Sequence, residues 1–280
     1  MHVERRLLMR RVAQVALVGG VTTVLVRGSA ASAPPSSPAR VFADPVNLRW
    51  TAAQPPIIRR ADWDTIGRNK PLPAPHYADA VKAIFIHHTD SGNEYDLADV
   101  PSIIWSMKDD QTGRRGWDDI GYNFLVDRFG NIYEGRHGGV DRPVIGAQCS
   151  GFNVNTAGIA AIGTFTEGAD VPTPMLQSLS ALCAWKLSLH GVDAVSSTVL
   201  TCSDSLSRFP AGSRATFAVI SGHTDADCTY CPGSALYAAL PGIRRQASQI
   251  QQSTDHPVFG NSTPVLQAKP TTTPSTPPGL

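Results

Sequence analysis

The sequence predicts an α/β domain, because segments typical of strands alternate with segments typical of helices between Val81 and Ala247. Residues 81–87 form a short apolar run of β-branched and aromatic side chains, which is typical of a buried strand. Residues 99–108 instead repeat apolar side chains at i, i+3, i+4 and i+7, the spacing of an amphipathic helix. With 42% hydrophobic and 17% charged residues in 280, the chain has the composition of one large globular domain with tails.

Later segments continue the alternation. A hairpin is expected from residues 123–126 and 131–134, joined by a turn that contains Gly130, and residues 156–163 are expected to form a strand in the middle of the sheet. Helices are expected at 174–190 and 236–247, the second interrupted near a turn by Pro241. Residues 196–217, rich in Thr, Ser and Arg, are expected to be a surface insertion near the functional site.

The two ends of the chain differ in composition from this domain. Residues 1–33 combine paired arginines, an apolar stretch and small residues, which predicts an export signal; the arginine pairs allow the twin-arginine route, and an uncleaved anchor is the alternative. Residues 34–56 are predicted to be a linker rich in Pro, Ala and Ser, residues 57–250 the folded domain, and residues 251–280 a disordered tail rich in Pro and Thr. Residues 1–33 carry a net +4, which leaves −3 for the rest of a chain of net +1, so polyanion binding is disfavoured.

Three side chains suggest a zinc site. His223 and Cys231 lie eight positions apart in a segment whose Gly, Asp and Pro content predicts a loop, and the apolar run ends in two histidines, His87 and His88, one of which would be the third ligand. Two imidazoles and one thiolate leave a fourth position open, as in catalytic zinc sites. Neighbouring side chains on a strand point to opposite faces, so His87 and His88 are not expected to bind the same ion.

At several ordered motifs the chain resembles the N-acetylmuramoyl-L-alanine amidases related to phage amidase-type lysozymes and to animal peptidoglycan recognition proteins. The resemblance covers about 57–247, and the motifs are residues 59–63 (RRADW), 86–89 (IHHT), 116–124 (GWDDIGYNF), 130–136 (GNIYEGR), 146–147 (GA), 158–160 (GIA) and 222–233. It implies a single α/β domain with a mixed central β-sheet flanked by helices, like that of the peptidoglycan recognition proteins. A zinc ion would lie at the floor of an open groove.

The resemblance also implies an activity and a set of site residues. The activity is zinc-dependent hydrolysis of the amide bond between N-acetylmuramic acid and L-alanine in peptidoglycan, by an exported, monomeric enzyme. His87, rather than His88, would join His223 and Cys231 as a zinc ligand, and zinc would lower the pKa of a bound water toward ~7. Tyr122 would donate a hydrogen bond to the developing oxyanion, and Thr229 would orient water or the oxyanion. The remaining contacts to substrate would come from the groove residues Arg136, Gln148 and Asn153.

Some positions differ from the family pattern. Asp64 stands where Gly is usual, Gln148 where many members have His, Thr224 where Arg is common, and Cys228 also departs from the pattern. None of these changes removes an expected zinc ligand.

The cysteine count and the function each leave alternatives open. If Cys231 binds zinc, the other four cysteines can form two disulfides in three ways, or Cys228 and Cys231 form a redox or structural-zinc pair. A non-catalytic peptidoglycan-binding module is the main alternative function, although binding-only members typically lack the cysteine ligand. A zinc peptidase of another class is disfavoured, because the sequence contains no His-Glu-x-x-His motif.

Overall fold

The computed structural model describes residues 50–65 and 71–253. The predicted export signal, most of the predicted linker and nearly all of the predicted tail lie outside the described residues. The described elements, in chain order, are β1 (Ile57–Ile58), α1 (Arg60–Trp63), β2 (Ala83–His88), a 3-10 turn (Leu97–Asp99), α2 (Val100–Asp109), a π-turn (Asp110–Arg114), β3 (Phe124–Val126), β4 (Ile132–Glu134), β5 (Thr156–Ala161), α3 (Thr173–Ser188), β6 (Ser197–Thr201), β7 (Arg214–Ala218), β8 (Ile220–Gly222), α4 (His223–Ala226) and α5 (Ser234–Gln252).

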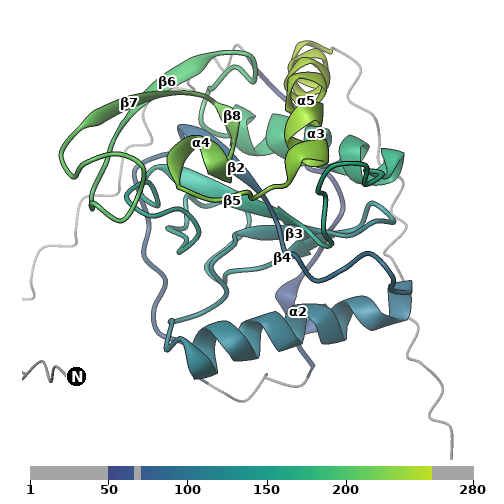
Figure 1. The fold of residues 1–280 in the computed structure, drawn as a ribbon. Helices are drawn as coiled ribbons and strands as arrows, with labels where there is room; N and C mark the ends of the chain where they lie inside the picture. Colours follow the sequence, from purple (N-terminus) through teal and green to yellow (C-terminus); the bar gives the residue numbers. More distant parts are fainter. Residues whose placement is uncertain (1–49, 66–70, 254–280) are drawn as a thin grey trace, which may run out of the picture. The chain divides into compact units, whose positions relative to one another are not determined.

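Six strands of the described chain form one mixed sheet in the order β1-β4-β3-β5-β2-β8 (Figure 1). Strands β3 and β4 are antiparallel and form the predicted hairpin, whereas every other neighbouring pair is parallel. Strand β5 is buried along its whole length between β3 and β2, as predicted for a central strand. The predicted fold class is therefore confirmed.

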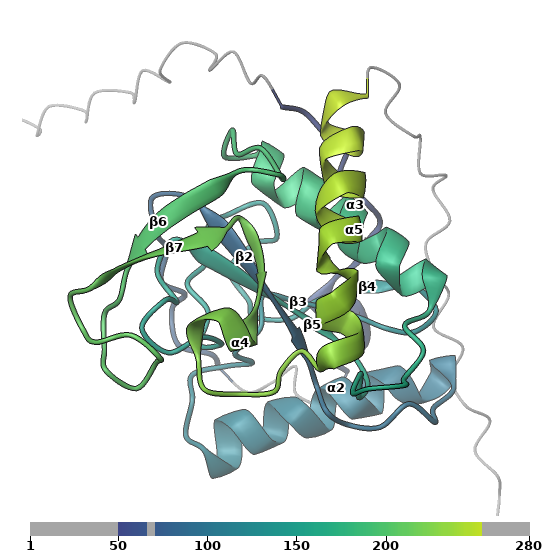
Figure 2. The same cartoon turned by 45° about the horizontal axis from the view of Figure 1, so that its top comes forward.

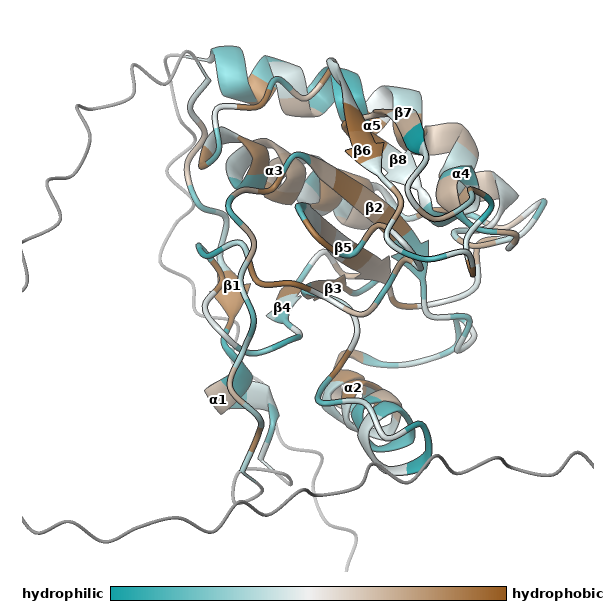
Figure 3. Ribbon diagram, turned by 90° about the vertical axis from the view of Figure 1, so that its left-hand side faces the viewer, coloured by the Kyte–Doolittle hydropathy of each residue, from teal (hydrophilic) through white to brown (hydrophobic). Residues whose placement is uncertain are grey.

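Helices cover both faces of this sheet. Figures 1, 2 and 3 show α3 and α5 together on one face and α2 across the other. Alternation along β2 explains the arrangement: Ile84 and Ile86 pack in the core beneath α3 and α5, whereas Phe85 packs with residues on the opposite face. In the described part of the chain, no helix has the length and apolarity needed to cross a membrane.

Helix α5 differs from the expected helix, which Pro241 was predicted to interrupt near a turn. It runs unbroken through this proline. Its buried face is formed by Leu236, Leu240, Ile243 and Ala247, which pack in the core shared with α3, whereas Pro241 is exposed. Proline removes one helical hydrogen bond, and the carbonyl that loses its partner lies in the preceding turn. Because the packed face of the helix is intact, the tertiary contacts keep α5 continuous through a residue that disfavours helix.

The predicted surface insertion contains an antiparallel hairpin of β6 and β7. One face of this hairpin contributes to a cluster of aromatic side chains. Phe217 of β7 packs edge-on against Phe85 of β2, with ring centroids 5.4 Å apart, and Phe152 and Phe209 pack against Phe217. The insertion therefore has its own apolar core, which fastens it to the main sheet next to the loop after β8.

A buried ionic cluster joins α1 to α2 and to the loop before β3. Arg60 binds both carboxylate oxygens of Asp119 at 2.8 Å, and Lys108 of α2 lies 2.5 Å from the carboxylate of Asp64. Asp64 also accepts a hydrogen bond from Arg60 at 3.3 Å. Asp64, which departs from the family pattern, is therefore paired with two cations in this chain.

Candidate metal centre

Two histidines leave the sheet side by side from adjacent strands. Strands β2 and β8 are parallel, with Ile86 opposite Gly222, so the next residues, His87 and His223, meet at the carboxyl edge of the sheet. Their ring centroids are 4.4 Å apart. This edge is where open α/β sheets generally bind ligands. His88 points elsewhere, because its Nδ1 accepts a hydrogen bond from the backbone N–H of Phe165 at 3.3 Å.

The segment after β8 returns Cys231 to these histidines. His223 begins a one-turn helix, α4, where a loop was expected, and the following residues fold back. The backbone N–H of Thr224 donates to the carbonyl of Cys231 at 2.8 Å. The sulfur of Cys231 accepts a hydrogen bond from the backbone N–H of His88 at 3.3 Å. Thr229, predicted to act in catalysis, holds the same segment, because its hydroxyl accepts the N–H of Cys231 at 3.2 Å.

The three donors expected from the sequence converge. One donor atom each from His87, His223 and Cys231 lies within 4.8 Å of the others, and His87 Nδ1 is 3.6 Å from Cys231 Sγ. Bond lengths of ~2.3 Å for Zn–S and ~2.0–2.1 Å for Zn–N, at a tetrahedral angle, place sulfur and nitrogen about 3.5 Å apart. The spacing of these two donors therefore fits a shared zinc ion.

A buried glutamine determines which nitrogen of His87 is available. Gln148 Oε1 lies 2.5 Å from His87 Nε2, and the Gln148 amide nitrogen donates to the hydroxyl of Thr156 at 3.2 Å. Because Gln148 uses its NH₂ group on Thr156, its oxygen faces His87 and accepts the Nε2 proton. The Nδ1 atom that faces Cys231 is then unprotonated and able to bind a metal. Gln148, predicted to contact substrate, is 8% exposed and lies beneath the metal donors.

Asp227 orients the ring of His223 in a similar way. Asp227 Oδ2 lies 2.7 Å from His223 Nε2 and also accepts the backbone N–H of Ser150 at 3.0 Å. A carboxylate on the distal nitrogen of a metal-binding histidine is a common arrangement that orients the ring and strengthens it as a ligand. The sequence analysis did not identify Asp227, although its i+4 spacing from His223 is a usable signal for a side-chain pair across a helical turn.

Burial determines the protonation of the donors. Burial, and next the nearby His223, hold the pKa of His87 well below its ordinary value, so this ring is neutral at neutral pH. Burial raises the pKa of the Cys231 thiol to about 12, and a hydrogen bond from the backbone of His88 only partly opposes this shift. Metal coordination deprotonates a thiol outright, so a cation at this position would compensate for the buried thiolate.

Tyr122 borders the three donors. Its ring centroid is 5.0 Å from that of His87. Burial, and next the sulfur of Cys231, raise the pKa of Tyr122 above its ordinary value of 10.0, so the hydroxyl keeps its proton at neutral pH. The phenol is therefore a donor, not a base, beside the metal donors.

The other two residues expected in the groove hold loop backbone. Arg136 has a side chain only 10% exposed, donates to the carbonyl of Ile120 at 3.2 Å and lies 3.8 Å from the carboxylate of Asp118. Asn153 Oδ1 accepts the backbone N–H groups of Gln148 and Cys149, at 2.7 and 3.0 Å. Asn153 thereby shapes the loop that presents Gln148 to His87.

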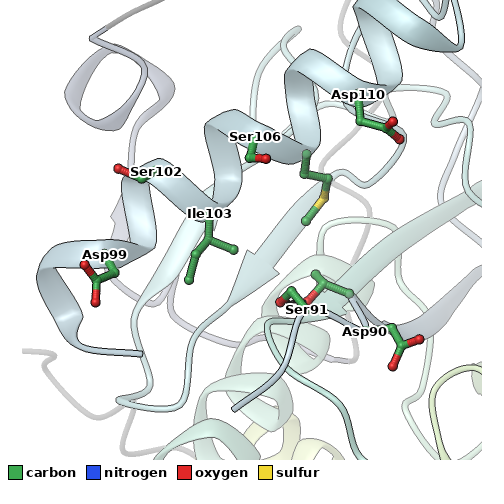
Figure 4. A pocket seen from close by; sticks show the side chains of 9 residues that line it. Asp90, Ser91, Asp99, Ser102, Ile103, Ser106 and Asp110 are labelled. Atoms are coloured by element: carbon green, nitrogen blue, oxygen red, sulfur yellow. Dashed lines mark hydrogen bonds between the residues drawn. The ribbon is translucent and has the colours of Figure 1, made fainter. Parts of the chain in front are cut away.

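A pocket of about 500 Å³ lies between α2 and the segment after β2. Figure 4 shows Asp99, Ser102, Ile103, Ser106 and Asp110 along the helix, with Asp90 and Ser91 opposite them. Its lining begins at Thr89, two residues after His87. This volume lies in the usual range of ligand pockets, roughly 300–1,000 Å³.

All five cysteines are free thiols in this structure. Cys149, Cys183 and Cys202 are buried, whereas Cys228 is exposed. The two disulfides considered from the sequence are not formed, and Cys228 makes no disulfide with Cys231.

Comparisons with known proteins agree with this arrangement. The family model described as N-acetylmuramoyl-L-alanine amidase (Amidase_2) matches residues 77–234. Peptidoglycan-recognition protein LB of Drosophila melanogaster is 27% identical over 195 residues, which cover 69% of this chain and 71% of the relative. The solved structure of bumblebee PGRP-SA has a TM-score of 0.52 and 25% identity, covering 67% of this chain and 95% of that chain.

A ligand complex is among the similar structures. Peptidoglycan recognition protein-LE in complex with tracheal cytotoxin, a monomeric diaminopimelic acid-type peptidoglycan, has a TM-score of 0.52 and 26% identity, covering 67% of this chain and 93% of that chain. The family match extends over more than half of the sequence and includes His87, His223 and Cys231. The chain belongs to the N-acetylmuramoyl-L-alanine amidase (Amidase_2) family.

Proposed function

We propose that this protein is a zinc-dependent N-acetylmuramoyl-L-alanine amidase that hydrolyses the amide bond between N-acetylmuramic acid and L-alanine in peptidoglycan. The observation that carries the proposal is the convergence of His87, His223 and Cys231, with 3.6 Å between His87 Nδ1 and Cys231 Sγ. A purely structural zinc site normally has four protein ligands, whereas three leave room for water and substrate. The family membership supports the same activity.

Zinc bound by these three side chains supplies Lewis acidity and lowers the pKa of water. The chain's own residues perform the remaining tasks. Tyr122, protonated at neutral pH, donates a hydrogen bond to the oxygen that gains charge when the amide carbonyl is attacked. Gln148 and Asp227 fix the two imidazole rings through their distal nitrogens.

The pocket along α2 offers space for a substrate. A muramyl peptide with its amide carbonyl beside Tyr122 would extend into the pocket along α2, whose lining begins at Thr89. Arg136 and Asn153 would then act on substrate through the loops that they hold, because their polar groups already bind the backbone. Peptidoglycan lies outside the cell membrane, so the proposal fits the export signal predicted at residues 1–33.

A non-catalytic recognition module is the second candidate. It is favoured by the peptidoglycan recognition protein-LE complex, in which a peptidoglycan fragment is bound by a similar fold. Both candidates predict binding to peptidoglycan, and only the amidase predicts new L-alanine amino termini.

The test compares wild type with Cys231→Ser on purified peptidoglycan, with bound zinc measured in the same samples. Cys228→Ser is the matched control, because Cys228 is an exposed thiol three residues from Cys231. We expect zinc and new L-alanine amino termini in wild type and in Cys228→Ser, and neither in Cys231→Ser. Wall binding and zinc without cleavage would support the recognition module, and cleavage by Cys231→Ser would refute the assignment of the site.

A further inference from the structure

A second cavity adjoins the segment that carries His223 and Cys231. Its volume is about 370 Å³, and its walls come from the loop after β5, Thr224 of α4, the loop after α4 and the start of α5. Thr224 follows the metal donor His223, and Tyr230 precedes the metal donor Cys231. The lining residues are Thr166, Thr224, Tyr230, Gly233, Ser234 and Tyr237.

Two tyrosines that differ in exposure and in contacts border this cavity. Tyr230 is 94% exposed, whereas Tyr237 is 41% exposed and its hydroxyl donates to Asp225 Oδ1 at 2.6 Å. The Tyr237 ring also lies against the backbone of Gly222, where an added Cβ would come within 2.7 Å of the ring. One aromatic wall is thus fixed against the strand that delivers His223, and the other stands open to solvent.

Backbone contacts at Gly233 join two walls of the cavity. Gly233 has φ +87°, and an added Cβ there would approach the carbonyl oxygen of Phe165 to 2.1 Å. The backbone N–H of Ala235 donates to the same carbonyl at 3.0 Å. The loop after β5 and the start of α5 are therefore in direct contact, and only glycine fits between them.

The chemistry of the lining indicates the kind of ligand. None of the six lining residues carries a charge, and the polar groups of the lining side chains are hydroxyls. The pocket along α2 is different, because three of its lining residues are aspartates. Aromatic rings combined with hydroxyl groups suit a neutral ligand with apolar C–H faces and many hydroxyls, which describes a pyranose ring.

We propose that this cavity is a saccharide subsite that receives a sugar unit of the glycan strand, stacked against Tyr230 and Tyr237. The choice of peptidoglycan glycan rests on the proposed function, because the cavity adjoins the segment that carries His223 and Cys231. In an amidated muramic acid the lactyl carboxyl is consumed in the amide bond, so the repeating disaccharide itself is uncharged and matches the uncharged lining. The subsite would hold the glycan while the peptide lies on the α2 side of the metal donors.

The test measures binding of chitotetraose, a β-1,4-linked N-acetylglucosamine oligomer without peptide, to the full chain by titration calorimetry or NMR. Tyr230→Ala removes the exposed ring without disturbing the core, and Tyr230→Phe keeps the ring. Leu206→Ala is the matched control, because Leu206 is 85% exposed and lies in the β6–β7 connection. We expect Tyr230→Ala to weaken binding about tenfold or more, as for an aromatic anchor at an interface, and Tyr230→Phe and Leu206→Ala to bind within about twofold of wild type.

Each outcome separates this inference from the proposed amidase activity, because binding of chitotetraose needs no cleavage. Absence of chitotetraose binding to wild type, or unchanged binding by Tyr230→Ala, would overturn the subsite even if peptidoglycan is cleaved. Binding that depends on the Tyr230 ring would support the subsite even if no L-alanine amino termini appear, in which case the amidase proposal alone fails.

Discussion

His87 Nε2 and Gln148 Oε1 lie 2.5 Å apart although the two residues are 61 positions apart in the sequence. This contact places the proton of His87 on Nε2 and leaves Nδ1, which lies 3.6 Å from Cys231 Sγ, able to bind a metal. Gln148 thus fixes the orientation of the His87 ring in this chain.

Replacing Gln148 tests this orienting role. Gln148→Leu leaves the Nε2–H of His87 buried without an acceptor. Loss of such a hydrogen-bond partner of a metal-binding histidine typically lowers metal affinity about 10–100-fold. We expect zinc affinity, measured by competition with a chromogenic chelator, to fall by that factor. Gln148→Glu, which keeps an acceptor oxygen, should restore most of it. Equal zinc affinity in wild type and Gln148→Leu would contradict the role.

Replacing Asp227 tests the corresponding contact of His223. We expect zinc affinity to decrease in the order wild type, Asp227→Asn, Asp227→Ala, because asparagine keeps an acceptor oxygen but loses the charge. The total loss for alanine should be about 10–100-fold. Asp204→Ala is the control, since Asp204 also accepts backbone N–H groups, from Gly151 and Leu206, but has no histidine partner. A similar loss of zinc affinity in Asp204→Ala would show that the loss comes from disturbing the loops and not from removing the carboxylate that contacts His223.

Tyr122→Phe removes the proposed oxyanion donor. If Tyr122 stabilises the transition state, kcat should fall about 10²–10³-fold, the usual effect of losing one such donor, while KM and bound zinc stay near wild-type values. Steady-state kinetics on a soluble muramyl peptide, with zinc content measured in parallel, would separate the two effects. An increase in KM with unchanged kcat would show that Tyr122 acts in substrate binding instead. A loss of bound zinc would show that it acts by holding His87.

Lys186 predicts a pH dependence of stability at alkaline pH. Its ammonium group is buried and donates to the carbonyls of Val140 and Arg142 at 2.7 and 2.8 Å, and burial lowers its pKa from 10.5 to about 8. The unfolded chain therefore binds this proton up to a higher pH than the folded chain. The penalty for burying the charge is present below pH 8 and is relieved as the pH rises from about 8 to 10.5.

The measurement is urea denaturation of wild type and Lys186→Met across this pH range. Groups that titrate in both proteins cancel in the comparison. The free energy of unfolding of wild type should rise relative to the variant by on the order of 3 kcal/mol. A difference between the two proteins that stays constant from pH 7 to 10.5 would exclude the lowered pKa.

The sequence by itself determined the fold class, because its strand and helix periodicities are local properties of the chain. It also singled out the three side chains that we propose as zinc ligands, and the structure brings them together. A histidine at the end of an apolar run, and a histidine and a cysteine in one glycine-containing segment, are chemically distinctive, and the family motifs selected His87 over His88. The parallel pairing of β2 and β8 then places these donors side by side.

Only the tertiary structure decided which residues support those donors. Gln148 carries no local signal that it contacts His87, and Asn153 none that it holds the backbone of Gln148, because both contacts depend on how the loop before β5 packs. The continuity of α5 through Pro241 and the aromatic core of the β6–β7 hairpin likewise depend on packing against distant elements. Side-chain chemistry and periodicity are properties of the chain itself, whereas burial and hydrogen-bond partners exist only once segments far apart in the sequence are in contact.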